Sequence, residues 1–415
     1  MRGSRRSADR PTAGCSRPLG PARFSGARVI RLASVVVLVA ACSGPILANP
    51  TLPPSVTARA TPGPSLPADP QPIALPRDDG PHARLTEWWY YTGHLRSADG
   101  RRFGFEAVVF RAERGALPVT WASHLALTDE AGGRFLYSQR SEVGAAADRS
   151  PRGPDGVPTG FALAITGFDP AVPESLTRDP WILAGSGGRD AIRTVLSPGE
   201  AATAGSGFGL DLELAAEKPP ALHGGIGWVD FLDAGSSYYY SRTRMAAIGT
   251  LTLDGETIGV EGTAWFDHQW GDFISVGGGG WDWFAVNLAD GTDLTVSLVR
   301  DSGGAYTLAY GTLVDRDGRT SHLAGDAVVV GPDPARTWRS PATSAVYPAG
   351  WTILVPREGL VIDLEPTLPD QELDTRPTTG VVYWEGSQVV RATRNGIPVA
   401  GEAYVELTGY APAGP

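Results

Sequence analysis

Three segments in the first half of the chain recur, in the same order, in the second half. In the longest pair, an aromatic cluster is followed by a leucine, an Asp-Gly turn and a strand of alternating polarity. The matched pairs are 88–111 with 281–300, 127–134 with 313–319, and 260–267 with 399–406. An ordered series of matches indicates a duplicated structural unit. The sequence therefore predicts two copies of one fold, joined near Gly277 in a run of four glycines.

The repeated unit consists of short strands. From Thr86 onward, runs rich in aromatic and β-branched residues end in Asp-Gly dipeptides, for example at 99–100, 254–255 and 290–291. These dipeptides favour tight hairpin turns. No segment of helical length shows a convincing 3.6-residue period, and many short strands joined by hairpins are typical of sandwiches and up-and-down barrels. We therefore expect an all-β fold made of two tandem antiparallel β-barrels.

The first 41 residues have the composition of an export signal. They hold eight Arg and one Asp, and their apolar run at 32–41 would rise about 15 Å as a helix, half the thickness of a bilayer. This length predicts a signal peptide at 1–41 and not a transmembrane span. The tetrad that ends at Cys42 resembles a bacterial lipobox, in which the cysteine is diacylated. The alternative is an ordinary secretory signal cleaved near Ala48.

A lipid anchor at Cys42 would attach the protein to a membrane by acyl chains alone. We therefore expect an exported, membrane-anchored lipoprotein of the cell envelope, or a periplasmic or secreted protein if the cleavage is ordinary. Ten prolines and no aromatic residue occupy 43–76, which predicts a Pro-rich tether at 42–76. The N-terminal barrel is predicted at 77–274 and the C-terminal barrel at 275–411.

The composition excludes several classes of site. Both cysteines, Cys15 and Cys42, lie in the first tenth of the chain, so the rest has no disulfide framework, cysteine-based zinc site or cysteine nucleophile. The formal net charge is −10, and because residues 1–41 carry +7, the remainder carries −17. Such a surface repels phosphate, so we expect no nucleic-acid partner. No serine has the Gly-x-Ser-x-Gly setting of a nucleophile elbow.

The segment 260–272 carries the densest group of chemically active side chains. Strand alternation places five of them on one face: Glu261, Thr263, Trp265, Asp267 and Gln269. An Asp267 that lies in a partly dry cavity beside Trp265 would have a raised pKa, as a general acid needs. In the alternative interpretation, Asp267 accepts hydrogen bonds from a turn or pairs with an arginine, and His268, on the opposite face, packs in the core.

Three other residues are weaker candidates for a binding site. His124 alternates with apolar residues, and Tyr238 and Tyr240 share one face of a tyrosine-rich strand. Burial in a core is the competing interpretation for each of them. The segment 267–272 contains metal-ligand residue types, but no second His cluster completes such a site. We therefore expect neither a metal nor a cofactor.

Six segments resemble, in their order, those of one protein family. They are EWWYYTGHL, FGFEAVVFR, WASHLALTD, LHGGIGW, the tyrosine-rich strand and GTAWFDHQWGDF. Over residues 82–410 the chain resembles the carotenoid 1,2-hydratase (hydroxyneurosporene synthase) and AttH-type lipocalin-like family. The resemblance implies two tandem lipocalin-like barrels. For the hydratase branch it implies an Asp that protonates the terminal double bond of an acyclic carotenoid before water adds, without a cofactor.

Carried over by position, this proton donor is Asp267, and Trp265 is its aromatic neighbour. Tyr238 and Tyr240 lie on the strand from which the hydratases present further pocket residues. The chain departs from the hydratases where this strand has Tyr in place of an expected His and Trp. Its WFDHQWG segment is closer to the AttH-type branch, whose activity the resemblance does not define.

Two functions of different classes remain open from the sequence. In the first, the protein is an exported, cofactor-independent hydro-lyase that hydrates or isomerises an isoprenoid or another unsaturated lipid, with Asp267 as proton donor. In the second, it is a non-catalytic lipoprotein that binds or carries an apolar small molecule. The residues expected to contact the ligand in either case are Trp265, His268, Tyr238, Tyr240 and His124.

Overall fold

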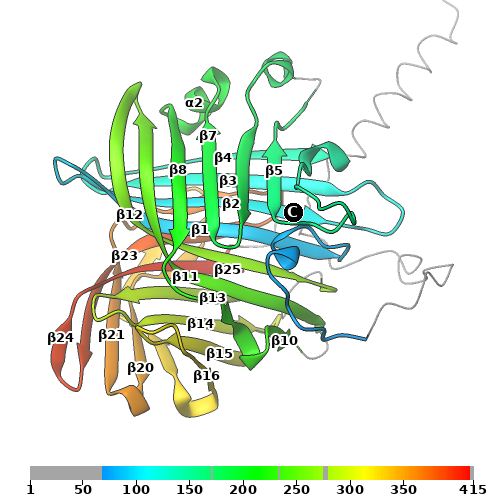
Figure 1. The fold of residues 1–415 in the computed structure, drawn as a ribbon. Helices are drawn as coiled ribbons and strands as arrows, with labels where there is room; N and C mark the ends of the chain where they lie inside the picture. Colours follow the sequence, from blue (N-terminus) through cyan, green and yellow to red (C-terminus); the bar gives the residue numbers. More distant parts are fainter. Residues whose placement is uncertain (1–67, 170–171, 232–233, 274–278, 412–415) are drawn as a thin grey trace, which may run out of the picture. The chain divides into compact units, whose positions relative to one another are not determined.

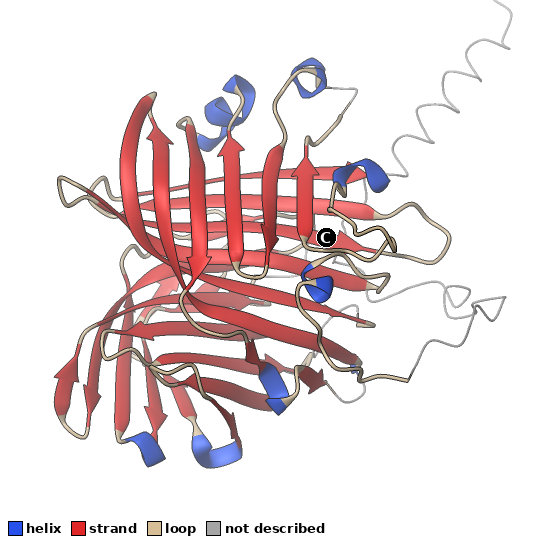
Figure 2. Ribbon diagram, viewed as in Figure 1, coloured by secondary structure: helices blue, strands red, loops and turns tan. Residues whose placement is uncertain are grey.

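The computed structural model describes residues 68–169, 172–231, 234–273 and 279–411. Nearly all of its regular structure is antiparallel β-sheet (Figure 2). The only α-helix in this described part is α2 (Pro198–Ala204). None of the helices there is long and apolar enough to cross a membrane. The predicted signal peptide, the lipidation residue Cys42 and the joint at Gly277 lie outside the described residues.

Twelve strands form the first sheet. They are β1 (Thr86–Ser97), β2 (Arg102–Ala112), β3 (Thr120–Asp129), β4 (Arg134–Val143), β5 (Phe161–Ile165), β6 (Trp181–Ser186), β7 (Arg189–Val195), β8 (Phe208–Ala216), β9 (Ala221–Leu222), β10 (Trp228–Asp230), β11 (Ser236–Leu253) and β12 (Glu256–Gly271). The main path runs β4-β3-β2-β1-β12-β11-β8-β7-β6-β5, and β9 and β10 pair with β11. The sheet curls until β5 lies against β3 and β4, which makes a barrel-like half (Figure 1).

Eleven strands form the second sheet. They are β13 (Gly280–Leu288), β14 (Asp293–Arg300), β15 (Tyr306–Val314), β16 (Thr320–Ala324), β17 (Val329–Pro332), β20 (Trp351–Val355), β21 (Leu360–Pro366), β22 (Glu372–Asp374), β23 (Val382–Arg394), β24 (Ile397–Val399) and β25 (Gly401–Thr408). A separate two-stranded ladder joins β18 (Thr337–Arg339) and β19 (Val346–Pro348).

The strand order of the second sheet repeats that of the first. Its main path runs β16-β15-β14-β13-β25-β23-β21-β20-β17. In both sheets the first four strands form a meander, and the last long strand of the half then pairs with the first strand. The three sequence matches fall on equivalent strands of these two orders. The predicted all-β fold with two tandem barrels is therefore confirmed.

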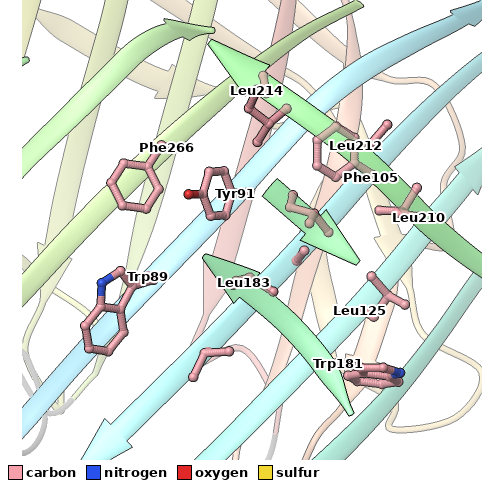
Figure 3. Close-up of a cluster of buried hydrophobic side chains, with 14 of the residues drawn as sticks. Trp89, Tyr91, Phe105, Leu125, Trp181, Leu183, Leu210, Leu212, Leu214 and Phe266 are labelled. Carbon is pink, nitrogen blue, oxygen red and sulfur yellow. The ribbon is translucent and has the colours of Figure 1, made fainter. Parts of the chain in front are cut away.

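Large side chains fill the interior of each half. In the first half, Trp89, Phe105 and Trp181 are buried among leucines from several strands (Figure 3). In the second half, Phe284 and Trp351 meet edge to face with ring centroids 4.9 Å apart. Burying such side chains is the dominant favourable term in folding. Each half thus has a packed hydrophobic core of its own.

The two halves pack through the outward faces of their sheets. Tyr90 on β1 and Trp265 on β12 both meet Trp283 on β13 edge to face, with centroids 5.3 and 6.1 Å apart. Val108, Ala285 and Tyr404 complete this buried cluster. The interface therefore contains aromatic pairs in the geometry that their quadrupoles favour.

A buried ion-pair group also connects the halves. Asp293 of β14 accepts bonds from Lys218 and Arg244 of the first half, each at 2.6 Å, and from Thr243 at 2.9 Å. Its carboxylate is fully buried. Removing Asp293 would leave the buried Lys218 without its counter-charge, which is strongly destabilising. The group therefore favours one arrangement of β11 against β14.

Two glycines of β12 provide a test of the close approach between β12 and β1. A Cβ on Gly262 would lie 1.9 Å from the backbone oxygen of His94, whereas a Cβ on Gly259 would meet nothing within 4 Å. We expect Gly262→Ala to lower the free energy of unfolding by roughly 2 kcal/mol or more, because the strands must separate. Gly259→Ala is the matched control and should be neutral or slightly stabilising. Urea denaturation measures both, and equal stabilities of the two variants would contradict the packing described.

Candidate functional site

A cavity of about 440 Å³ lies between the outward faces of the two halves. The first half lines it from β1, β2, β3, β11 and β12, and the second half lines it from β13, β14, β15, β23 and β25. The aromatic lining residues are Trp88, Tyr90, Phe110, Phe231, Tyr239, Phe273, Trp281, Trp283, Tyr310 and Tyr383. The acidic and imidazole side chains in the lining of the buried part are Glu106, His124, Asp267 and Glu406. An apolar wall with a few convergent polar groups is typical of a small-molecule site.

Strand register places Asp267 at the centre of the first half's outward face. Tyr90 on β1 pairs with Asp267 on one side, and Ser241 on β11 pairs with it on the other. Because directly paired residues point to the same face of a sheet, the three side chains form one row. Gln269 lies two residues further along β12 on the same face and also lines the cavity.

Three donors hold the Asp267 carboxylate. Tyr239 donates to Oδ2 at 2.5 Å, the Trp265 indole donates to Oδ1 at 2.7 Å, and the Ser241 hydroxyl donates to Oδ1. Burial raises the pKa of Asp267 to about 6, although these hydrogen bonds act in the opposite direction. Among the described residues, no Arg or Lys forms an ion pair with Asp267. The site therefore holds a buried carboxyl that exchanges its proton near neutral pH.

A buried imidazole continues the chain of hydrogen bonds behind Asp267. His223 lies 2.6 Å from the Ser241 oxygen through Nε2 and 2.8 Å from the Thr312 oxygen of β15 through Nδ1. Burial lowers the pKa of His223 to about 3, so the ring is neutral. Because Ser241 gives its only proton to Asp267, His223 donates from Nε2 and accepts from Thr312 at Nδ1. The chain thus joins Asp267 to the second half of the protein.

Three glutamates form a second acidic group in the same interface. Burial and the charge of Glu406 raise the pKa of Glu106 to about 8, although a Tyr383 hydrogen bond opposes this. Burial, reinforced by Asp267, raises the pKa of Glu406 to about 7. Glu385 is the direct cross-strand partner of Glu406, and its pKa is raised well above the usual range by burial and by that neighbour. Close carboxyls with no counter-charge hold protons at neutral pH.

The structure separates the predicted binding residues into two sets. Asp267 and His124 line the cavity, and Trp265 adjoins it through its bond to Asp267. His124 lies 2.8 Å from the Tyr383 oxygen through Nδ1. Burial lowers its pKa to about 3, so it is a neutral participant in the interface.

His268, Tyr238 and Tyr240 do not line this cavity, because strand alternation turns them to the opposite face. His268 stacks on Trp89 at 4.6 Å inside the first half, which is the core position of the alternative interpretation. The Tyr238 hydroxyl donates to Asp69 at 2.7 Å, and the Tyr240 hydroxyl donates to Asp79 at 2.5 Å. The tyrosine that faces Asp267 is the one between them, Tyr239.

His268 lies close to two other residues of types that can bind metals, His82 and Glu87. The sequence pattern did not predict this grouping. Glu87 Oε1 lies 2.7 Å from His82 Nδ1 and 3.0 Å from His268 Nε2, and one ligand atom from each residue falls within 4.8 Å of the others. Both rings can donate to this one carboxylate oxygen, so hydrogen bonds alone account for the arrangement. Arg111 lies 3.9 Å from Glu87 and disfavours a cation there. Asp267 and Asp272 are not part of this group.

The fold and this site define a class of protein, a tandem β-barrel with a carboxyl-lined cavity between its halves. A family model described as AttH-like matches residues 66–410, and the chain belongs to this family. A solved putative AttH from Nitrosomonas europaea is 31% identical, with a TM-score of 0.67, and the match covers 83% of this chain and 99% of that chain.

Two other solved structures share the fold at lower identity. Kievitone hydratase from Nectria haematococca is 16% identical, with a TM-score of 0.56 and coverage of 81% of this chain and 93% of that chain. CghA, solved with Sch210972, is 14% identical, with a TM-score of 0.53 and coverage of 79% and 89%. No curated protein matches the chain.

The raised pKa of Glu106 predicts how stability depends on pH. A carboxyl whose folded pKa lies above its unfolded value contributes stability that is complete below the unfolded pKa and is lost as pH rises through the folded pKa. For Glu106 this window runs from about 4.5 to about 8. We expect the urea midpoint to fall between pH 5.5 and pH 8.5, and to fall less in Glu106→Gln, which has no proton to lose.

The matched control for this experiment is Glu402→Gln. Although burial acts to raise the pKa of Glu402, His94 and Arg96 lower it below its usual value. Its charge is therefore constant between pH 5.5 and pH 8.5, and the control should retain the wild-type slope. Equal slopes for Glu106→Gln and the wild type would show that Glu106 does not hold its proton in the folded protein.

Proposed function

We propose that the protein catalyses acid-assisted hydration or isomerisation of a carbon–carbon double bond in an isoprenoid or another unsaturated lipid. The ligand binds in the cavity between the two halves, and Asp267 donates the proton. The observation that carries this proposal is the setting of Asp267: a buried carboxyl without a cationic partner among the described residues, at the wall of an aromatic cavity. A general acid is most effective when its pKa lies near the working pH.

The reaction balances with Asp267 alone as acid and base. The O–H bond of Asp267 breaks, its proton forms a C–H bond with the less substituted alkene carbon, and the other carbon becomes a tertiary cation. Water then forms a C–O bond with this cation, and the surplus proton returns to the Asp267 carboxylate. In an isomerisation, the cation instead loses a neighbouring C–H proton to the carboxylate. Trp88, Trp281 and Trp283 line the cavity, and the π-electrons of such rings can stabilise a cation.

The hydrogen-bond donors around Asp267 suit both the loss and the return of its proton. Tyr239, Trp265 and Ser241 stabilise the carboxylate that forms when the proton leaves. The neutral His223 behind Ser241 orients its hydroxyl and adds no net charge. Membership of the AttH-like family and the fold shared with kievitone hydratase agree with a hydratase-type reaction.

Asp267→Asn tests the proton donor. We expect it to lower turnover at least about 100-fold, because an amide cannot donate this proton, while the fold and ligand binding are retained. Geranylgeraniol, squalene and lycopene, each incubated with the protein in D₂O, serve as substrates, and mass spectrometry detects deuterium bound to carbon. The matched control is Asp272→Asn, since Asp272 is half exposed and pairs with Arg84. Unchanged deuterium incorporation in Asp267→Asn would exclude Asp267 as the acid.

The pH profile gives an independent measurement of the same step. Because Asp267 must carry its proton, kcat/KM should fall about tenfold per pH unit above about pH 6. Tyr239→Phe removes a donor that stabilises the carboxylate, so the profile should move to higher pH. A Tyr239 that only packs against the cavity would lower the rate without moving the profile.

A non-catalytic carrier is the second candidate function. It is favoured by the complete hydrogen bonding of Asp267, whose three donors are what a purely structural carboxylate also needs. In this case the cavity binds an apolar molecule that is released unchanged. Lipid extracted from the purified protein and identified by mass spectrometry, without deuterium incorporation from D₂O, would support the carrier.

We also propose that the protein is exported and held at the cell envelope by acyl chains on Cys42. The basic, apolar composition of 1–41 and the lipobox-like tetrad support this. We expect the wild type to fractionate with membranes and to need detergent for release, whereas Cys42→Ala enters the soluble fraction. Cys15→Ala is the matched control and should remain with the membranes. Immunoblots of the fractions measure both variants, and a soluble wild type would contradict the anchor.

A further inference from the structure

One oxygen of Glu106 lacks the partner that a buried carboxyl oxygen needs. Glu106 lies on the outward face of β2, lines the cavity and is 1% exposed. Its Oε1 lies 2.8 Å from the Tyr383 oxygen, but its Oε2 has no hydrogen-bond partner. Most buried polar side-chain atoms in proteins are satisfied, so an unpartnered one at a cavity wall indicates a place for a ligand's polar group.

The surroundings of Glu106 favour an uncharged ligand group. The titratable side chains that face it are Tyr90 of β1, His124 of β3, Tyr383 and Glu385 of β23, and Tyr404 and Glu406 of β25. In the described part of the chain, no Arg or Lys forms an ion pair with any of the three glutamates. The one cationic side chain in the described lining, Arg300, pairs with Asp282 at 3.3 Å. An anionic ligand group beside Glu106 would therefore be buried without a counter-charge of its own. A cationic ligand would need Glu106 to be ionised. A Glu106 carboxylate would have one hydrogen-bond donor, Tyr383, whereas the Asp267 carboxylate has three.

The hydrogen-bond chain behind Glu106 fixes which of its oxygens carries the proton. The Thr378 hydroxyl donates to Gln139 Oε1 at 2.6 Å, so His124 donates from Nε2 to the Thr378 oxygen, 3.1 Å away. The neutral ring then accepts at Nδ1 from the Tyr383 hydroxyl at 2.8 Å. Because Tyr383 has no second proton, a neutral Glu106 donates from Oε1 to the Tyr383 oxygen, 2.8 Å away. The free Oε2 is thus an acceptor, and a hydroxyl group of a ligand can donate to it.

We propose that Glu106 binds a hydroxyl group of the ligand, so that the cavity selects an uncharged, otherwise apolar alcohol or phenol over the corresponding hydrocarbon, carboxylate or amine. This inference rests on the proposed function, because it places the polar end of the same ligand whose double bond reacts at Asp267. The proposed substrate therefore carries a hydroxyl group as well as a double bond.

Four naphthalene probes test the inference on the unmodified protein. Calorimetry at pH 6.5 compares 2-naphthol, naphthalene, 2-naphthoate and 2-naphthylmethylammonium, which share one ring system and differ in the polar group. We expect 2-naphthol to bind at least tenfold more tightly than each of the others. Equal affinities for naphthol and naphthalene, tighter binding of the ammonium or the carboxylate, or no binding of any probe would overturn the inference.

Variants then assign the preference to Glu106. Glu106→Leu should abolish the tenfold preference for naphthol while naphthalene still binds, and Glu106→Gln should keep most of it, because an amide also donates and accepts. Glu385→Gln is the matched control: Glu385 also has an unpartnered Oε2, but it does not line the cavity, so the preference should remain. A preference that survives in Glu106→Leu would place the hydroxyl elsewhere.

The outcome is separable from that of the proposed function. Asp267→Asn should keep the preference for naphthol although it loses deuterium incorporation. Loss of incorporation without any preference for naphthol overturns only the hydroxyl site. A naphthol preference in a protein that never incorporates deuterium overturns only the catalytic proposal, and leaves a carrier for alcohols or phenols.

Discussion

The site depends on the packing of the two halves against each other through the outward faces of their sheets. Each half has its own core, so neither needs the other to bury its interior side chains. Asp267, Glu106 and Glu406 instead point outward from their sheets. Asp267 and Glu106 are buried, and Glu406 is half-buried, only because the opposite sheet covers them. Their raised pKa values follow from this burial. The Asp293 ion-pair group and the Trp283 contacts hold the two faces in register.

Duplication explains why the cavity has two groups of acids and why they differ. Ser241 pairs with Asp267 in the first half, and Glu385 pairs with Glu406 at the equivalent position of the second. A hydroxyl beside the first acid gives it a donor, whereas a carboxyl beside the second adds a like charge. The Asp267 carboxylate is therefore stabilised by hydrogen bonds, whereas Glu385 and Glu406 hold their protons more strongly. The two halves contribute similar strands but chemically different sites.

Strand alternation in the sequence predicted which residues of β12 share a face, and Trp265, Asp267 and Gln269 do share one. The pattern contained no information on which face of β11 would meet them, because a run of three tyrosines is compatible with either. That choice depends on the pairing of Tyr239 with Gln269 across β11 and β12, a contact between distant residues. One partner of His223, Thr312, likewise comes from the other half, as does the Tyr90 hydroxyl that donates to Glu385 at 2.6 Å. Local pattern therefore predicted the fold and the first acid, but not the interface that completes the site.

The balance around Asp267 sets how strong an acid it can be. Burial alone would keep it protonated but would also make it a weak donor to a carbon–carbon double bond, because the carboxylate left behind would be poorly stabilised. Three hydrogen bonds alone would make it a strong acid that is already ionised well below neutral pH. A pKa of about 6 lies between these limits, with burial raising it and Ser241, Tyr239 and Trp265 lowering it. The donors therefore do not argue against the proposed catalytic role, since they lower the free energy of the carboxylate that the proposed reaction would form.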